Sequence, residues 1–470
     1  MNLQEPVNVA GNRQLQQIKS YSGYYQCSAE LLYPADVESL CNILAMARQQ
    51  NRKVSFRGEG YSFDSQGLNN DLLISLKQFT KIEVNASAKQ VTVGPGANWR
   101  NILNAVSPYN LIPAVMVSTG HASAGGTFSA NCMSRFSPVL GKEGKWVDSF
   151  IIITADGVAR RCSRTENEDL FYAAIGGFGY LGAVTEITYN LYPVPENAKV
   201  KSLVLRKPNH ADLYKDLITD SNTKGTVYSA FGISGKQIRT MTCLVEYSSE
   251  TRLKQMVPHR PELTFRLVTE FLVQWFPSMG QLFWNYAYSV YTRISDNYID
   301  TIDGFTFFMD GNVRATLLGR RWGMTFKAVQ QTFIIPATEH NLNYFLSETL
   351  SLLKGANMPP AMIDALYLPK DERFLLSSTN NLNGYALSMA FSSLSPAKFE
   401  KIKGAMEQLS ELCMQLKGKV HLTKNVLTKP EHIQSMYQDA LPQFFAVKKK
   451  YDPNNLFSND FIERIFPDYV

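Results

Sequence analysis

Apolar side chains recur at helical spacing in some segments of the chain and at every second position in others. After Pro34, the segment Val37–Ala47 carries its apolar residues three or four positions apart and predicts a helix. Thr185–Leu191 alternates with its polar neighbours and predicts a strand ending at Pro193. The same patterns predict strands at Val54–Phe56, Leu72–Leu76, Gln90–Val93 and Phe150–Thr154, and a helix at Glu168–Ile175. The first 195 residues therefore mix short strands and helices, which is typical of an α+β domain.

The composition changes after Pro195, and we predict a second domain there. Its predicted strands and helices include Thr240–Tyr247, Gln331–Ile335, Asn341–Leu353 and Pro396–Leu416. The last part of the chain, 425–470, is rich in aromatic and basic side chains and can pack on either domain. We therefore expect a first domain over 1–195, a second over 196–424, and a separate C-terminal segment.

Composition and charge limit the class of protein. The chain has 470 residues, of which 45% are apolar and 19% charged, and this argues against a disordered or fibrous protein. Lysine and arginine exceed aspartate and glutamate by 47 − 41 = 6. That excess suits an anionic small molecule or a membrane surface, but it is too weak to predict binding to nucleic acid.

Cysteine and histidine spacing give no sign of a metal site. The six cysteines lie far apart without a C-x-x-C pair, which argues against a disulfide framework or a structural zinc ion. The six histidines have no metal-ligand spacing either. The N-terminal residues lack the pattern of a secretory signal, and no apolar run reaches the ~18–20 residues of a membrane span. We therefore predict a cytoplasmic protein without a metal.

Two other segments have alternative interpretations. Phe271–Tyr291 holds eight aromatic residues in 21, interrupted by Pro277 and Gly280. Core packing explains this, but a loop that touches lipid or an apolar substrate tail explains it as well, so peripheral membrane contact is a further expectation. The run Lys448–Lys450 is interpreted as a solvated face.

The first of three glycine clusters, Arg57–Ser62, directly follows a predicted strand. Glycine permits positive φ, and successive backbone N–H groups in such a turn can converge on an anion. Arg57 and Ser62 add side-chain donors. A plain tight turn is the alternative.

The second cluster, Ser118–Thr127, consists almost wholly of small and hydroxyl residues between two apolar segments. Such a stretch lets a large ligand lie against the backbone. The third cluster, Gly177–Gly182, matches the letters of the dinucleotide fingerprint G-x-G-x-x-G. That fingerprint needs a strand before it and a helix after it, and here the predicted order is the reverse, so a Rossmann site is rejected.

Together, these clusters resemble the FAD-linked oxidoreductases of the vanillyl-alcohol oxidase family. V-S-F-R-G-E-G-Y-S is similar to the pyrophosphate loop of that family, and S-A-G-G-T-F-S-A-N and G-G-F-G-Y-L-G-A-V-T are similar to its later FAD-binding blocks. The resemblance implies a two-domain, PCMH-type FAD-binding fold of the α+β class with an α+β cap. It places FAD contacts on Arg57, Gly58, Glu59, Gly60, Tyr61, Ser62, Thr119, Gly120, Ser123, Gly125, Gly126, Thr127, Ser129, Ala130, Gly182 and Val184.

The end of the chain resembles a particular group within that family. V-H-L-T-K-N-V and the tail from Lys449 to Ile465 are similar to the decaprenylphosphoryl-ribose oxidases. In that group the last segment folds back beside the flavin, so 425–470 is expected to return to the FAD-binding domain. The resemblance implies that Lys424 sits at the flavin and substrate as a catalytic residue.

Three departures from the family qualify this picture. Tyr61 stands where covalent members carry a flavin-linking histidine, and Thr119 to His121 stand where others carry a linking cysteine, so FAD is expected to be held non-covalently. Met133 stands where the ribose oxidases have an active-site histidine.

The resemblance implies an FAD-dependent enzyme that takes a hydride from the carbinol carbon of a sugar-like or polyol-like substrate with a lipid or phosphate group. The electron acceptor is expected to be oxygen, a quinone or a partner reductase. A C–C bond oxidoreductase related to the sterol reductases is one alternative. A flavin-binding interaction module that has lost catalysis, as the substitution at Met133 allows, is another.

Overall fold

The fold is described from a computed structural model. It covers residues 14–207, 209–219, 226–234, 237–250, 297–322, 327–355, 362–371, 373–392 and 395–470. The aromatic segment Phe271–Tyr291 lies outside these residues.

The first sheet is small and combines parallel and antiparallel pairs. Its order is β1-β2-β4-β3, with β1 antiparallel to β2 and β4 parallel to both β2 and β3. The helix α1 packs on it through Leu40, Leu44 and Ala47, and Asp36 and Ser39 cap the helix reciprocally. The elements are β1 (Leu15–Lys19), β2 (Gln26–Leu32), α1 (Val37–Gln49), β3 (Val54–Arg57) and β4 (Leu72–Ser75).

The second sheet has the order β5-β6-β10-β8-β9, and β7 pairs with the end of β10. Its long central strand is the one that the alternation around Thr185–Leu191 predicted. The strands are β5 (Ile82–Asn85), β6 (Gln90–Val93), β7 (Leu111–Pro113), β8 (Val147–Ile153), β9 (Ala159–Ser163) and β10 (Ala183–Pro193). The helices in this part of the chain are α2 (Trp99–Val106), α3 (Ala124–Phe128), α4 (Ser137–Leu140) and α5 (Glu168–Ala174).

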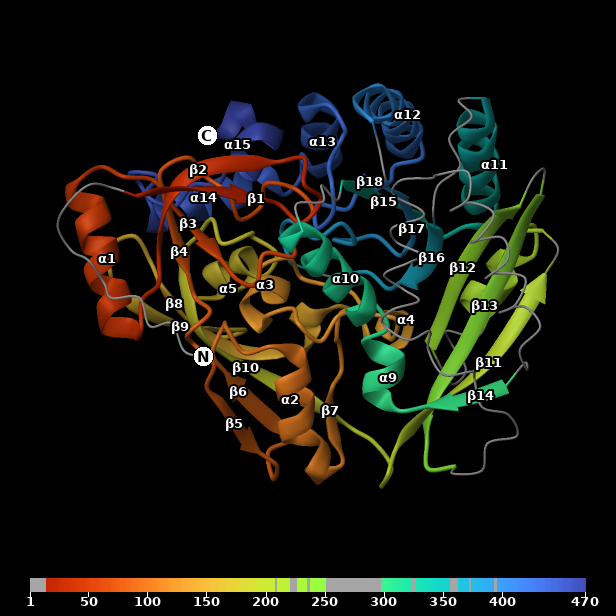
Figure 1. Ribbon diagram of the computed structural model, residues 1–470, viewed down its shortest axis with the longest axis horizontal. Coiled ribbons are helices and arrows are strands. Elements are labelled where there is room, and N and C mark those ends of the chain that lie inside the picture. The colour runs from red at the N-terminus through yellow and green to blue at the C-terminus, as the bar shows by residue number, and fades with distance from the viewer. Residues whose placement is uncertain are drawn as a thin grey trace.

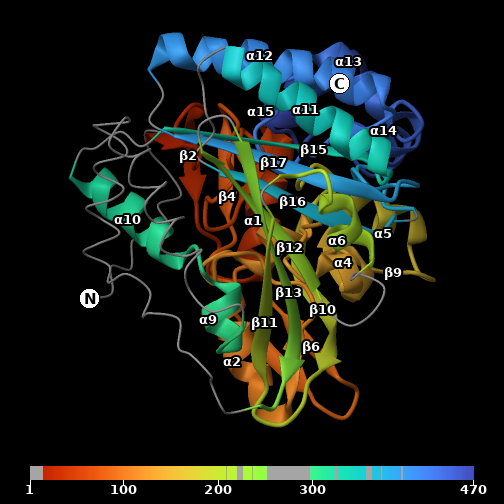
Figure 2. The same cartoon turned by 90° about the vertical axis from the view of Figure 1, so that its right-hand side faces the viewer.

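The third sheet contains eight described strands in the order β14-β11-β13-β12-β16-β17-β15-β18, and every described pair is antiparallel. Its strands are β11 (Lys199–Lys207), β12 (Thr226–Ser234), β13 (Gln237–Ser248), β14 (Asn297–Asp300), β15 (Ala328–Pro336), β16 (Met362–Leu368), β17 (Gly384–Ser392) and β18 (Lys419–Val420). Long helices α11 (Glu339–Gly355) and α12 (Pro396–Gln415) lie side by side on one end of this sheet (Figures 1 and 2). The shorter helices α6 (Leu213–Thr219), α9 (Ile302–Thr306) and α10 (Asp310–Arg321) complete this part.

The C-terminal segment contacts both the first and the third sheet. Its helix α13 (Pro430–Tyr437) lies beside α12 and β18, and α14 (Leu441–Tyr451) lies beside α5. Beyond α14, the chain pairs with β3: the N–H of Val54 donates to Leu456 O and the N–H of Ser458 to Val54 O, both at 2.8 Å. The final helix α15 (Asp460–Ile465) follows directly (Figure 1). The division of the chain at residues 195 and 425 stays a prediction.

The structure corrects the interpretation of Lys448–Lys450. Lys449 and Lys450 are exposed, but Lys448 is buried. Its ammonium donates to Tyr180 O at 2.9 Å, Phe457 O at 2.5 Å and the carboxylate of Asp452 at 2.6 Å. Helical periodicity turns the first lysine of the run inward, where an ion pair and two carbonyls satisfy it.

No helix within the described part of the chain is long and apolar enough to cross a membrane. The same residues contain no group of three or more histidine, cysteine or acidic side chains arranged to hold a metal ion.

Candidate functional site

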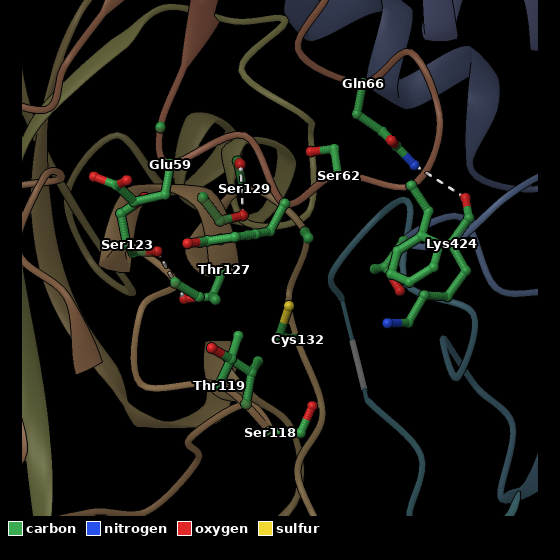
Figure 3. A pocket seen from close by; sticks show the side chains of 18 of the residues that line it. Glu59, Ser62, Gln66, Ser118, Thr119, Ser123, Thr127, Ser129, Cys132 and Lys424 are labelled. Atoms are coloured by element: carbon green, nitrogen blue, oxygen red, sulfur yellow. Dashed lines mark hydrogen bonds between the residues drawn. The ribbon is translucent and has the colours of Figure 1, made fainter. Parts of the chain in front are cut away.

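A cavity of about 390 Å³ lies between the first two sheets on one side and the third sheet on the other. Figure 3 shows part of it, with Ser123, Thr127 and Thr119 on one wall and Lys424 on the opposite one. The structure brings almost all of the predicted site residues to this cavity: Arg57, Gly58, Glu59, Gly60, Tyr61, Ser62, Thr119, Ser123, Gly125, Gly126, Thr127, Ser129, Ala130, Gly182, Val184 and Lys424.

Gly120 is the predicted residue that does not line the cavity. It is buried behind the wall, where its N–H donates to the carboxylate of Asp310 at 2.9 Å. Thr119 donates its hydroxyl to the same carboxylate oxygen at 2.7 Å, and Arg100 donates to the other oxygen at 2.5 Å. Asp310 begins α10, so this contact fixes the second glycine cluster against a helix that the sequence places in the cap.

The first glycine cluster forms one wall with unused backbone donors. No backbone N–H of Gly58–Ser62 donates a hydrogen bond to another described residue. Gly60 has a φ of 79°, which only glycine adopts readily, and an added Cβ there would meet the guanidinium of Arg57. Glu59 is the one acidic side chain of the cluster, and Lys77 pairs with it at 3.2 Å. The loop therefore offers a set of donors to an anion.

The second cluster forms an adjoining wall with an unused hydroxyl. Ser123 Oγ is buried and has no hydrogen-bond partner among the described residues. A Cβ added at Gly58 would collide with it, and one added at Gly126 would lie 3.2 Å from it. The two glycine clusters thus face each other at this hydroxyl, with a narrow space that side chains at either glycine would fill.

A buried network holds the second cluster in place. Trp99 Nε1 donates to Thr127 Oγ1 at 3.0 Å, and Thr127 Oγ1 donates to Glu143 at 3.0 Å. The hydroxyl of Tyr189 on β10 donates to the same Glu143 oxygen at 2.7 Å. Burial raises the pKa of Glu143 to about 8, so this carboxyl is mostly protonated at neutral pH and places little charge behind the cavity.

Lys424 lies in a segment tied to the residues just after the first glycine cluster by hydrogen bonds from side chains to backbone carbonyls. Gln66 Nε2 donates to Leu422 O at 3.0 Å and to Lys424 O at 3.1 Å, the second of which is drawn in Figure 3. Asn425 Nδ2 donates to Phe63 O at 3.0 Å. The Lys424 ammonium lies 4.5 Å from the centre of the Phe63 ring. This segment therefore positions one cation on the cap side of the cavity.

The charges around Lys424 are few. Burial lowers the pKa of Lys424 below its ordinary value, and the carboxylate of Asp364 acts in the opposite direction. Burial also raises the pKa of the Cys132 thiol. Cys132 is therefore a neutral thiol at neutral pH, facing the lysine across the cavity (Figure 3).

Sequence reasoning missed the cap residues that complete the cavity. Strands β15, β16 and β17 contribute Gln330, Asp364 and Ser388, and His421 precedes Lys424 by three residues. These residues are spread over more than ninety positions, and only the antiparallel pairing of the strands brings them together. The H-x-x-K spacing of His421 and Lys424 was the one local signal available.

The third glycine cluster has the order that excludes a Rossmann site, as predicted. Helix α5 precedes it and β10 follows it. Phe178 adopts a φ of 54° at the cavity, with its N–H donating to Ser129 O at 2.8 Å and its carbonyl accepting from Asn459 at 3.1 Å. The C-terminal segment thus supports this edge of the cavity.

Comparisons with known proteins agree with this geometry. Residues 29–163 match the FAD binding domain family, and residues 365–465 match the D-arabinono-1,4-lactone oxidase family. The chain is 29% identical over 173 residues to the FAD-linked oxidoreductase fogF of Aspergillus ruber, covering 36% of this chain and 34% of that protein. It is 27% identical over 179 residues to mouse L-gulonolactone oxidase, covering 38% and 40%. It is 28% identical over 190 residues to cytokinin dehydrogenase 1 of Arabidopsis thaliana, covering 38% and 33%.

The chain is a flavoprotein with an α+β fold, in which residues 29–163 match the FAD binding domain family. Both matched parts are those of FAD-linked oxidoreductases, so the chain is similar to this group of proteins, as its glycine clusters together predicted. Its matches span about a third to two fifths of the length of the curated relatives.

The residues of the cavity fit this cofactor. The free N–H groups of Gly58–Ser62 suit a pyrophosphate, and the unpartnered Ser123 Oγ offers a further donor next to them. A Cβ on either side would close the glycine-lined space between the two clusters. The absence of these Cβ atoms therefore allows a large ligand to approach the backbone closely.

Substitution of Gly58 by alanine tests this fit. The new Cβ would collide with Ser123 Oγ, so we expect Gly58→Ala to weaken FAD binding at least tenfold, about 1.4 kcal/mol, while the apoprotein remains folded. Titration of apoprotein with FAD measures the affinity, and circular dichroism checks the fold. Gly404→Ala is the control, because nothing lies within 4 Å of that position. Unchanged affinity in Gly58→Ala would show that FAD does not lie against this loop.

Proposed function

We propose that this chain is an FAD-dependent oxidoreductase that oxidises a secondary or primary alcohol of a sugar-like or polyol-like substrate. The observation that carries the proposal is the two-sided cavity. Polar groups gather on its cap side, and the glycine clusters that fit FAD form the opposite walls. FAD, when bound, accepts the hydride from the carbinol carbon; the protein supplies binding, orientation and electrostatics.

The cap side of the cavity suits a hydroxylated substrate. Gln330 donates to Ser388 Oγ at 2.8 Å, and Thr332 donates to the same oxygen at 2.9 Å, which fixes a polar surface on β15 and β17. Asp364 and Lys424 add one charge of each sign. Alcohol groups can donate to and accept from such a set, whereas an apolar ring would leave it unsatisfied.

The remaining lining of the cavity suits a substrate that carries an additional apolar or anionic group. Apolar side chains lie beside the polar cap, and Met133 packs against a cluster that includes Leu366 and Ala386. The apolar lining residues include Met116, Val117, Met133, Phe136, Phe308 and Val313. The net charge of +6 favours an anionic partner. Contact with a membrane surface and electron transfer to a partner reductase stay predictions.

The relatives point to sugar-derived and other substrates. Those proteins are named for oxidation of L-gulonolactone and cytokinin, and the C-terminal family is named for D-arabinono-1,4-lactone. A lactone of a sugar acid carries several free hydroxyls and fits the polar cap of this cavity. The C–C bond oxidoreductase and the flavin-binding interaction module are distinguished from this proposal by the first test below.

The chain supports non-covalent binding of FAD. Tyr61 has neither an imidazole nor a thiol, and burial raises its pKa to about 12. Cys132 is a thiol on the cavity wall, but its raised pKa keeps it protonated, and the thiolate is the nucleophilic form.

The function is tested by anaerobic reduction of the bound flavin, followed by its loss of visible absorbance. The probes are D-arabinono-1,4-lactone, L-gulono-1,4-lactone, xylitol, and ribose paired with ribose 5-phosphate and a lipid-phosphate riboside. We expect at least one alcohol to reduce the flavin. We also expect the phosphate or lipid-phosphate form to do so faster than the free sugar, because remote binding energy helps to position the carbinol. If no alcohol reduces the flavin, the proposed function is wrong. If the paired compounds have equal rates and half-saturations, the proposal that the substrate carries an anionic or lipid group is wrong.

Replacement of Lys424 tests its role at the cofactor. A cation that stabilises the negative charge arriving with the hydride acts mainly on the chemical step, so Lys424→Met should slow flavin reduction by ~10²–10³-fold. The midpoint potential of the bound FAD should fall as well. Lys429→Met is the control, because Lys429 is exposed in the same segment. A wild-type reduction rate and potential in Lys424→Met would contradict the assignment.

Acid precipitation tests the mode of FAD attachment. The purified protein should be yellow, and all of its flavin should remain in the supernatant after precipitation with trichloroacetic acid. Fluorescence of the supernatant and of the washed pellet measures the partition. Flavin retained in the pellet would show a covalent bond, and mass spectrometry of its peptides would then locate the linked residue.

A further inference from the structure

His421 presents one ring nitrogen to the cavity. The residue precedes Lys424 by three positions, lines the same cavity and is only 3% exposed. The backbone N–H of His421 donates to Thr332 O at 2.8 Å, and this bond holds the residue at the edge of the third sheet. Its Nδ1 lies 2.8 Å from the hydroxyl of Ser378. Nε2 has no hydrogen-bond partner among the described residues, and it is not one of the atoms sealed from solvent, so it faces the cavity.

The surroundings keep this imidazole neutral. Burial, together with the positive charges of Lys142 and Lys424, lowers the pKa of His421 well below its ordinary value. Lys142 lies 2.9 Å from Asp371, so its charge is partly compensated. The other titratable groups that line this side are Cys132, which is a neutral thiol, and Asp364. A neutral imidazole has one nitrogen with a free lone pair, and a hydrogen bond at the other nitrogen decides which one it is.

We propose that His421 is the general base of the alcohol oxidation, accepting the substrate hydroxyl proton at Nε2. This inference rests on the proposed function. The O–H bond breaks and its electrons form the second carbon–oxygen bond, while the hydrogen on carbon leaves with its electron pair for FAD. The proton ends on Nε2, and the imidazole becomes imidazolium.

The other polar groups of the cavity are less suited to this step. Lys424 is a cation, and the Cys132 thiol has no lone pair of comparable basicity. Asp364 is a carboxylate, but it also offsets the charge of Lys424. Ser378 is a positioning residue in this scheme: with Nδ1–H donating to its hydroxyl, the lone pair is left on Nε2. The positive charges of Lys142 and Lys424 make His421 a weaker base in the resting protein. During the reaction, negative charge arrives at the cofactor and offsets the charge of Lys424, so His421 becomes a stronger base as the proton transfers.

The kinetic test uses His421→Asn in the complete FAD-bound protein. We expect anaerobic flavin reduction, by whichever alcohol probe reduces the wild type, to slow by ~10²–10⁴-fold at saturating substrate. In the wild type the rate should be constant around pH 7 and fall only below the ordinary histidine pKa of ~6.5. A base must be deprotonated to act, so this acidic decline should disappear in His421→Asn. His340→Asn is the control, since His340 is exposed on α11.

A second readout does not depend on turnover. In protein labelled with ¹⁵N-histidine, the signal absent from His421→Asn identifies this ring. We expect it to be neutral at pH 7 with the proton on Nδ1. Ser378→Ala should lose the preference for a proton on Nδ1 and should slow flavin reduction, though less than His421→Asn does. Ser378→Thr keeps the hydroxyl and should retain both the Nδ1 proton and the wild-type rate.

The outcomes separate the two proposals. If the alcohols reduce the wild type and His421→Asn at the same rate, His421 is not the base and the proposed function stands. An imidazolium at pH 7, or a proton fixed on Nε2, would also overturn the assignment. So would loss of the acidic decline in Asp364→Asn but not in His421→Asn. If no alcohol reduces the wild type, the proposed function fails, and this inference fails with it.

Discussion

The buried carboxylate of Asp64 connects the segments on which the site depends. One of its oxygens accepts from the N–H and the hydroxyl of Ser65 at 2.7 and 3.0 Å and from Arg464 at 2.7 Å. The other accepts from the N–H of Val426 at 3.0 Å. Asp64 thereby joins the loop after β3, the segment that carries Lys424, and helix α15. Because a buried charge is tolerated only with several such partners, the three segments are constrained to one arrangement.

This constraint explains how one cavity can combine two kinds of surface. The wall that fits FAD consists of backbone and small side chains, and its shape depends on glycines at Gly58, Gly60 and Gly126. The cap wall consists of side chains on strands, which are positioned by sheet pairing. Gln66 links the two walls through the carbonyls of Leu422 and Lys424. A fixed relation between the walls is what a hydride transfer requires, since the donor and acceptor atoms must be close and aligned.

The electrostatics of the cavity follow from burial. Desolvation keeps the Glu143 carboxyl and the Cys132 thiol mostly protonated and the His421 imidazole neutral, so Lys424 and Asp364 carry opposing charges on the cap side of the cavity. Next to buried groups, a single cation exerts more influence than it would at a surface. The site is thus suited to stabilising negative charge that appears during the reaction.

The sequence alone determined the local elements and the wall that fits FAD. Helix α1, strand β10 and the long helices α11 and α12 lie where their periodicity predicted them, because the burial of one face imposes that periodicity locally. The glycine clusters could be interpreted for the same reason: the turn and the close approach are properties of a few adjacent residues. Lys448 shows the limit, because its burial depends on the distant Tyr180, whose carbonyl accepts from its ammonium only in the folded structure. Gln330, Asp364, Ser388 and His421 share one cavity only through the pairing of distant strands and the return of the C-terminal segment. No local pattern encodes such contacts, so the substrate side of the site was decided by the tertiary structure.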